Sequence, residues 1–185
     1  MCSDLIAAIR SSDDAVSAAA WQSAGNHGSA AVGPLAELLS DPQAEIVRRG
    51  KRALYRVVRH AGRPGARGEA QAVERELLAA LKHAGAGGRR ELLWLLSEIG
   101  GPSAVGPIAA LLADEAVRED ARCALTRIPG RKATAALKAA LKRSPADFRP
   151  ALAESLRQRG VNVKGYPSRK LAPVAQTSVG PLPPR

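Results

Sequence analysis

Apolar residues recur along this chain with the spacing of a single helical face. In residues 117–128 they stand at i, i+4, i+7, i+8 and i+11, and the same spacing appears earlier at Ile46, Gly50, Ala53, Leu54 and Val57. Good helix formers dominate, and the sequence has no sustained alternation typical of strands. The pattern predicts an all-α fold with helices over 45–60, 89–99, 117–128 and 148–159.

An internal repeat predicts a second set of helices between these. Residues 103–114 (SAVGPIAALLAD) match residues 30–41 (AAVGPLAELLSD) at an offset of 73, and weaker copies follow. The aligned apolar positions, which lie 42, 31 and 29 residues apart, are Leu35, Leu77, Ile108 and Leu137. Repeats of this length are typical of stacked helical hairpins that share one core. We therefore expect a solenoid of about four to five hairpins.

Glycine and proline mark the expected turns. The segment 63–68 (RPGARG) lies in the long first interval and predicts a lengthened turn, and 85–88 (GAGG) predicts a turn before a helix. The expected organisation is a capping helix in 1–12, a repeat solenoid in 13–159 and a Pro-rich basic tail in 160–185. Asp13 or Asp14 is expected to cap the second helix.

The segment 117–130 (VREDARCALTRIPG), followed by a short Ala/Leu helix, resembles the HEAT-like repeats of the phycobilisome-lyase type. The resemblance covers about residues 13–159 and implies a right-handed α-α superhelix whose second helices line a groove. It implies that Lys82, Lys138 and Lys142 face this groove. It also implies that arginines at the starts of first helices bridge consecutive repeats, namely Arg89, Arg118 and Arg149. Such repeats serve many roles, so the resemblance leaves the function open.

Charge adds a candidate binding surface. The net charge is +11, yet residues 1–40 and 68–120 are acidic, and the basic residues gather in 45–67 and 121–159. Within 45–67, the row Arg48, Arg52 and Arg56 repeats every four residues, and three more candidates lie alongside: Arg49, Tyr55 and Arg59. Because like charges at this spacing repel, an anionic partner would stabilise the row. The alternative is an ordinary solvated helix face.

The sequence offers little catalytic chemistry. The three histidines are scattered, Cys2 and Cys123 have no metal-ligand spacing, and no Gly-rich phosphate loop is present. Trp94, with acidic residues a turn away, is better explained by packing or a protein contact than by an active site. We therefore predict no cofactor, no metal and no enzymatic activity. Without a leader or membrane-length apolar run, a reducing, cytoplasmic setting is expected.

The function predicted from these features is a scaffold that binds a protein partner, with an acidic surface, through its curved face. Nucleic-acid binding through the basic blocks is the alternative, because phosphate contacts need the same cations. No small-molecule substrate is inferred.

The tail cannot continue a helix because it contains five prolines after Gly160. Its spaced apolar residues could pack back along the last hairpin as an extended cap, and they are Val161, Val163, Tyr166, Leu171 and Val174. The end, 181–185 (PLPPR), resembles a polyproline ligand.

Overall fold

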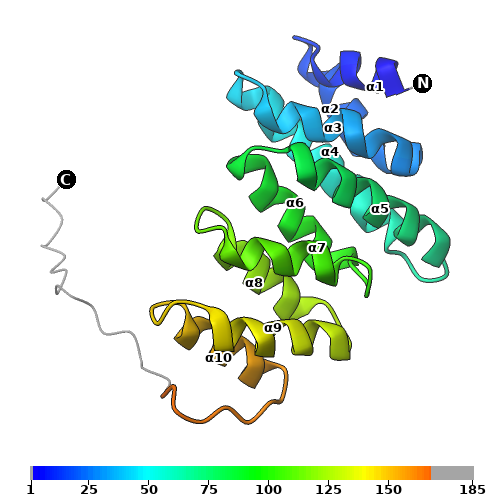
Figure 1. Ribbon diagram of the computed structural model, residues 1–185. Helices are drawn as coiled ribbons and strands as arrows, with labels where there is room; N and C mark the ends of the chain where they lie inside the picture. The colour runs from blue at the N-terminus through cyan, green and yellow to red at the C-terminus, as the bar shows by residue number, and fades with distance from the viewer. Residues whose placement is uncertain (1, 168–185) are drawn as a thin grey trace, which may run out of the picture.

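The computed structural model of the chain describes residues 2–167, and these residues form helices stacked in two layers (Figure 1). The layer of first helices contains α2 (Asp14–Ser23), α4 (Ala44–Ala61), α6 (Ala86–Ile99), α8 (Arg118–Arg127) and α10 (Arg149–Gln158). The layer of second helices contains α3 (Val32–Glu37), α5 (Arg67–His83), α7 (Val105–Ala110) and α9 (Arg131–Arg143). Helix α1 (Cys2–Ile9) packs on α2 at the N-terminal end. The chain is an α-solenoid, as the repeat predicts.

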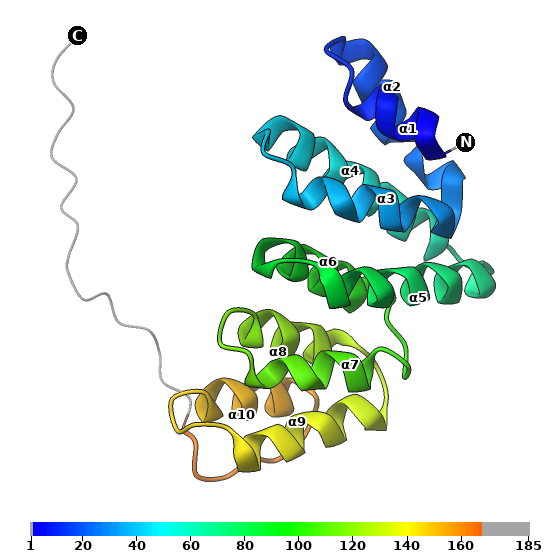
Figure 2. The same cartoon turned by 45° about the horizontal axis from the view of Figure 1, so that its top comes forward.

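Short 3-10 segments extend two of the second helices. Ala24–Ala31 precedes α3 and Leu38–Ser40 follows it, and Leu111–Ala113 follows α7. Both α3 and α7 contain the Val-Gly-Pro sequence of the repeat, and both lead into an aspartate that begins an extended link. The two views show that consecutive hairpins stack along one axis and change direction gradually (Figure 2).

A single apolar core runs the length of the stack. The aligned positions Leu35, Leu77, Ile108 and Leu137 are all fully buried. Small residues allow the layers to approach closely, and Gly50, at an apolar position of the helical face, is one of them. A Cβ added there would lie 2.8 Å from the Cβ of Leu38.

Arginine–aspartate pairs join consecutive repeats. Arg89 reaches Asp114 at 3.3 Å, and Arg118 reaches Asp147 at 2.7 Å, so the predicted bridging role is confirmed for these two arginines. Arg149 differs, because its Nε donates to the carbonyl oxygen of Ser144 at the end of the preceding helix α9. No further described repeat follows α10 within residues 2–167 to provide a carboxylate.

The long first interval has a different origin from the one expected. Arg67 and Gly68 belong to α5, so the link between α4 and α5 is only residues 62–66. The extra length lies in the helices, since α4 has 18 residues and α5 has 17, against 10 in α8 and 13 in α9.

The predicted turn at 85–88 is also wrong in part. Helix α6 begins at Ala86, and Gly88 lies in its first turn against Ala84 and Leu39.

The start of the predicted tail packs on the last hairpin. Val161 and Val163 lie against the core, and Arg157 donates to the carbonyl oxygens of Val163 and Tyr166. This confirms the expected packing for these two valines. Leu171, Val174 and the 181–185 motif lie outside the described residues. No helix among the described residues is both long and apolar enough to cross a membrane.

Candidate binding surface

The basic block of residues 45–67 is half neutralised by the chain itself. Arg48 pairs with Glu45, Lys51 with Glu91 at 2.6 Å, and Arg63 with Glu69 at 2.6 Å. Glu69 and Glu91 lie outside the block in the sequence, and Glu45 is its single acidic residue. The block is therefore less cationic than its sequence indicates.

Arg49 is a correction to the predicted binding surface. It is only 8 % exposed, and its guanidinium donates to the backbone oxygens of Ile9 and Ser11 and to Asp14. These groups belong to the turn between α1 and α2, so Arg49 ties the N-terminal hairpin to α4. Because Arg49 follows Arg48 by one residue on the helix, the side chain of Arg49 points toward that neighbouring hairpin and away from solvent.

Three further arginines of the block stack on aromatic rings, and Arg67 does not. Arg52 and Arg56 lie over the ring of Trp21 in α2, with their guanidinium carbons 5.4 and 5.7 Å from its centroid. Arg59 lies over the ring of Tyr55 at 5.5 Å. A guanidinium that stacks on a ring keeps its N–H edges available for other acceptors. All three arginine side chains are exposed.

A fourth stacked arginine continues this arrangement onto two further first helices. Arg127 of α8 lies 4.9 Å from the ring centroid of Trp94 in α6, and Trp94 is 44 % exposed. The four arginines make no ion pair or hydrogen bond with residues 2–167. We call these residues the outer row, and they are Trp21, Arg52, Tyr55, Arg56, Arg59, Trp94 and Arg127.

Tyr55 connects the two halves of the outer row. It is half-buried against the core and lies beside Trp94. Burial, together with the nearby carboxylates of Glu91 and Glu98, raises the pKa of the Tyr55 hydroxyl. One face of the Tyr55 ring is covered by the guanidinium of Arg59.

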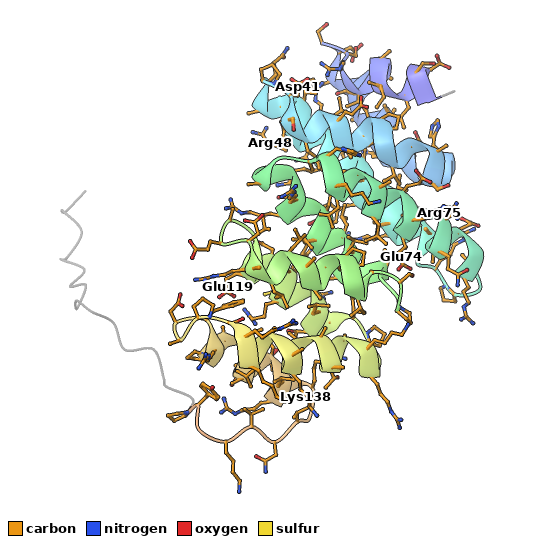
Figure 3. All side chains as sticks on the ribbon, viewed as in Figure 1. Asp41, Arg48, Glu74, Arg75, Glu119 and Lys138 are labelled. Atoms are coloured by element: carbon orange, nitrogen blue, oxygen red, sulfur yellow. The ribbon has the colours of Figure 1, made fainter. Side chains whose placement is uncertain are left out.

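The three candidate lysines do not share one face. Lys82 lies at the edge of a hollow between α5 and α7. Lys138 lies in a different hollow with Arg131 and Arg159, on the side of α9 that a further second helix would cover (Figure 3). Lys142 is exposed near the end of α9. The repeat equivalent of Lys138 is Leu78, which lines the hollow between α5 and α7. The groove position of the lysines stays a prediction.

Sequence reasoning missed Arg127 and the role of both tryptophans in the outer row. No local motif marks these residues, because Trp21, Trp94 and Arg127 come from three different helices. The signal that could have found them is the repeat register, which places all first helices in one layer. Within the described part of the chain, no group of three or more His, Cys, Asp or Glu residues could hold a metal ion.

Neither a protein-family model nor a curated protein sequence matches this chain. Solved structures of designed repeat proteins have a distantly similar arrangement. A designed armadillo repeat protein in complex with the peptide (KR)4 has a TM-score of 0.46 and 18% identity, covering 85% of this chain and 81% of that one. A second designed armadillo repeat protein has a TM-score of 0.34 and 16% identity, with coverage of 85% and 99%.

The crystal structure of an engineered protein has a TM-score of 0.44 and 17% identity, and the match covers 85% of this chain and 78% of that chain. These similarities are distant. The assignment of the chain as an α-solenoid rests on its own helices and their stacking.

Proposed function

We propose that this chain is a non-enzymatic HEAT-like scaffold of the cytoplasm that binds an acidic segment of a partner protein through the outer row. The observation that carries the proposal is the set of four exposed arginines that are stacked on rings and paired with no carboxylate. Stacking orders each guanidinium in advance, which lowers the entropy lost when it binds a carboxylate. Bidentate pairs with Asp or Glu are the contacts such groups make best.

The chemistry of the outer row favours an acidic protein over a nucleic acid. The rings of Trp21 and Trp94 already carry guanidinium groups, so a base could stack on those faces only by displacing an arginine. Glu91 and Glu98 lie close enough to raise the pKa of Tyr55. Glu91 pairs with Lys51, but Glu98 is exposed and would repel a continuous phosphate chain, whereas a peptide can direct its acidic side chains to individual arginines.

A binding titration tests the proposal. The probe is a fluorescent peptide of alternating Glu and Gly, and the variant is Arg52→Gln with Arg56→Gln, which removes two charges and retains helix-forming residues. Each charge-assisted hydrogen bond contributes about 1.5–3 kcal/mol, so we expect the affinity to fall at least about tenfold. The matched control is Lys138→Gln with Lys142→Gln, which removes the same charge from α9.

The control should bind the peptide within about twofold of wild type, since its lysines lie outside the outer row. Equal losses in both double variants would show that only net charge matters and would contradict the proposed site. Tighter binding of a single-stranded RNA of the same charge, lost with Arg52→Gln and Arg56→Gln, would favour the nucleic-acid alternative.

A further inference from the structure

A buried carboxylate distinguishes α5 from the other second helices. Glu74 stands three residues before the aligned Leu77, and the residues at the same place in the other repeats are Val32, Val105 and Thr134. Glu74 is only 5 % exposed. A carboxylate at a core position costs free energy unless a partner compensates it. We therefore expect Glu74 to lower the stability of its repeat.

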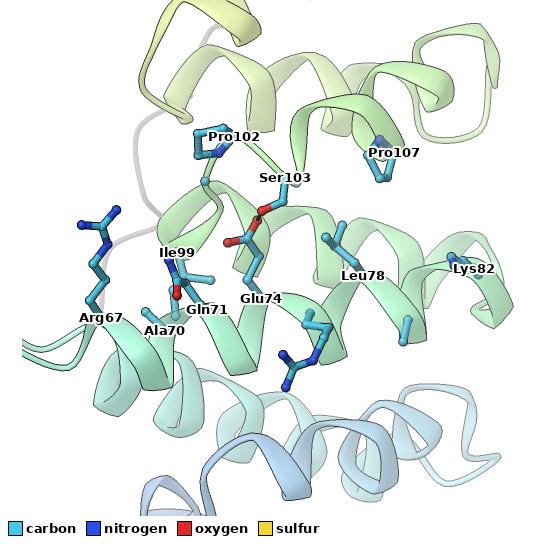
Figure 4. A pocket seen from close by; sticks show the side chains of 13 residues that line it. Arg67, Ala70, Gln71, Glu74, Leu78, Lys82, Ile99, Pro102, Ser103 and Pro107 are labelled. Carbon is cyan, nitrogen blue, oxygen red and sulfur yellow. Dashed lines mark hydrogen bonds between the residues drawn. The ribbon is translucent and has the colours of Figure 1, made fainter.

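Glu74 has an incomplete set of partners. The hydroxyl of Ser103 donates to Oε1 at 2.6 Å, and Figure 4 shows the two side chains meeting between α5 and the segment before α7. No lysine, arginine or histidine of residues 2–167 forms an ion pair with Glu74. Its other oxygen, Oε2, lies beside Gly101, where an added Cβ would be 3.3 Å away. Oε2 accepts no hydrogen bond from the described part of the chain, and it is open to solvent.

The carboxylate lies in a hollow of about 690 Å³ between α5 and α7. This volume falls within the ~300–1,000 Å³ range usual for ligand pockets. Apolar atoms form most of the wall, with contributions from Leu78, Ile99 and Pro107. Arg67 and Lys82 stand at opposite ends of the hollow (Figure 4).

We propose that this hollow binds the ammonium or guanidinium group of a single Lys or Arg side chain from a partner peptide. The charged head would donate to Oε2 of Glu74 while its methylene stem packs on Leu78 and Ile99. This combination of an apolar wall and one buried acid matches a long side chain with a cationic tip. The site lies in the layer of second helices, so it is separate from the outer row.

The cations around the hollow restrict the sequence of that peptide. Arg67, Arg75 and Lys82 all line it, and each repels positive charge, so the single carboxylate of Glu74 can offset the repulsion for one cation only. A polybasic segment is therefore disfavoured. The charge pattern fits one basic residue with acidic residues on either side, because their carboxylates can reach the rim while the central cation reaches Glu74.

NMR titration of the full chain tests the site. The probe is a capped Asp-Arg-Asp tripeptide, and its matched control carries norleucine in place of Arg. We expect the amide signals of Gly101 and Ser103 to shift with the Arg probe and not with norleucine. Glu74→Gln, which removes the charge and preserves the shape, should abolish these shifts, whereas Glu76→Gln on the same helix should retain them.

The variant Glu74→Val distinguishes a loss of probe binding from a loss of folding. Because Val32 and Val105 occupy the same position in other repeats, this variant should melt at the same temperature as wild type or higher while losing the probe. A lower melting temperature would contradict the view that Glu74 is retained at the expense of stability. Probe shifts that persist in Glu74→Gln, or that norleucine reproduces, would overturn the site.

Two further probes distinguish a cationic side chain of a peptide from a free small amine. Capped Lys-Arg-Lys should bind at least about tenfold more weakly than Asp-Arg-Asp, given the rim charges. Agmatine, a free guanidinium compound, should also bind more weakly than Asp-Arg-Asp. If agmatine binds more tightly than either peptide, the hollow is a small-amine site and the peptide proposal is wrong.

Discussion

At the scale of single residues, a few aspartates determine where helices begin and how repeats connect. Asp13 accepts hydrogen bonds from the backbone N–H groups of Ala15 and Val16, which resolves the choice between Asp13 and Asp14 as the cap. Asp14 instead pairs with Arg49. The sequence indicated that one of the two would cap the helix, but only the backbone geometry decides which.

Removing the Asp13 cap should destabilise the N-terminal hairpin. Asp13→Ala leaves two N–H groups at the start of α2 without their acceptor, and the expected loss in free energy of unfolding is about 1 kcal/mol. Chemical denaturation measures it. Ser12→Ala, at an exposed neighbouring position, is the control and should change stability by less than about 0.5 kcal/mol. Equal effects of the two changes would contradict the cap.

The aspartates between repeats should make stability depend on pH. Hydrogen bonding by Arg118 lowers the pKa of Asp147, and the backbone N–H of Gln43 with Arg10 lowers the pKa of Asp41. A lowered folded-state pKa gives stability that is present above the unfolded value, which is 3.8 for both groups. This stability is lost as the pH falls further through the folded value.

Thermal melts from pH 7 to pH 2 check this dependence. We expect Asp147→Asn to be less stable than wild type at pH 7 and to lose less of its stability below pH about 4. A wild-type-like slope in this variant would show that the Arg118 contact does not contribute to acid unfolding.

At the scale of elements, small residues permit the close approach of helices. Gly50 of α4 faces Leu38, and His60 of α4 faces Gly25 in the segment Ala24–Ala31. A Cβ added at either glycine would lie 2.8 Å from the Cβ of the facing residue. The sequence pattern identified Gly50 because it occupies an apolar position of the helical face. It did not predict the 3-10 segments or the start of α5 at Arg67, since these depend on how each turn meets its neighbours.

Two helical glycines provide a paired test of this packing. Gly50→Ala should lower the free energy of unfolding by about 1–3 kcal/mol, because the new methyl group collides with Leu38. Gly87→Ala in α6, where an added Cβ meets nothing within 4 Å, should raise it by about 0.5–1 kcal/mol. Denaturant midpoints of both variants check the signs. A stabilising Gly50→Ala would contradict the observed helix contact.

At the scale of the whole molecule, the repeat was predictable from sequence and the surface was only partly so. The offset between residues 30–41 and 103–114 was enough to predict stacked hairpins. The charge of a surface depends on pairs formed in space, such as Lys51 with Glu91, and a linear count cannot see them. Arg49 shows the same limit, because a one-residue offset decides between solvent and the interior.

Glu74 could have been recognised from the repeat alignment, since a carboxylate there replaces Val32 and Val105. The position lies three residues before the one that defines the register, on the buried side of the helix. The outer row, by contrast, needs the relative positions of four helices, from α2 to α8. An internal repeat thus shows which residue departs from its equivalents in the other repeats. It does not show which residues of different helices are in contact.

NMR titration with the Glu-Gly peptide tests the central claim most directly. The chain contains two tryptophans, and both belong to the outer row, so their two indole N–H signals report on the proposed site. We predict that both signals shift in proportion to occupancy and that the Arg52→Gln and Arg56→Gln variant loses the shift of Trp21. Peptide binding that leaves both indole signals unchanged and shifts residues of α9 instead would contradict the proposed surface.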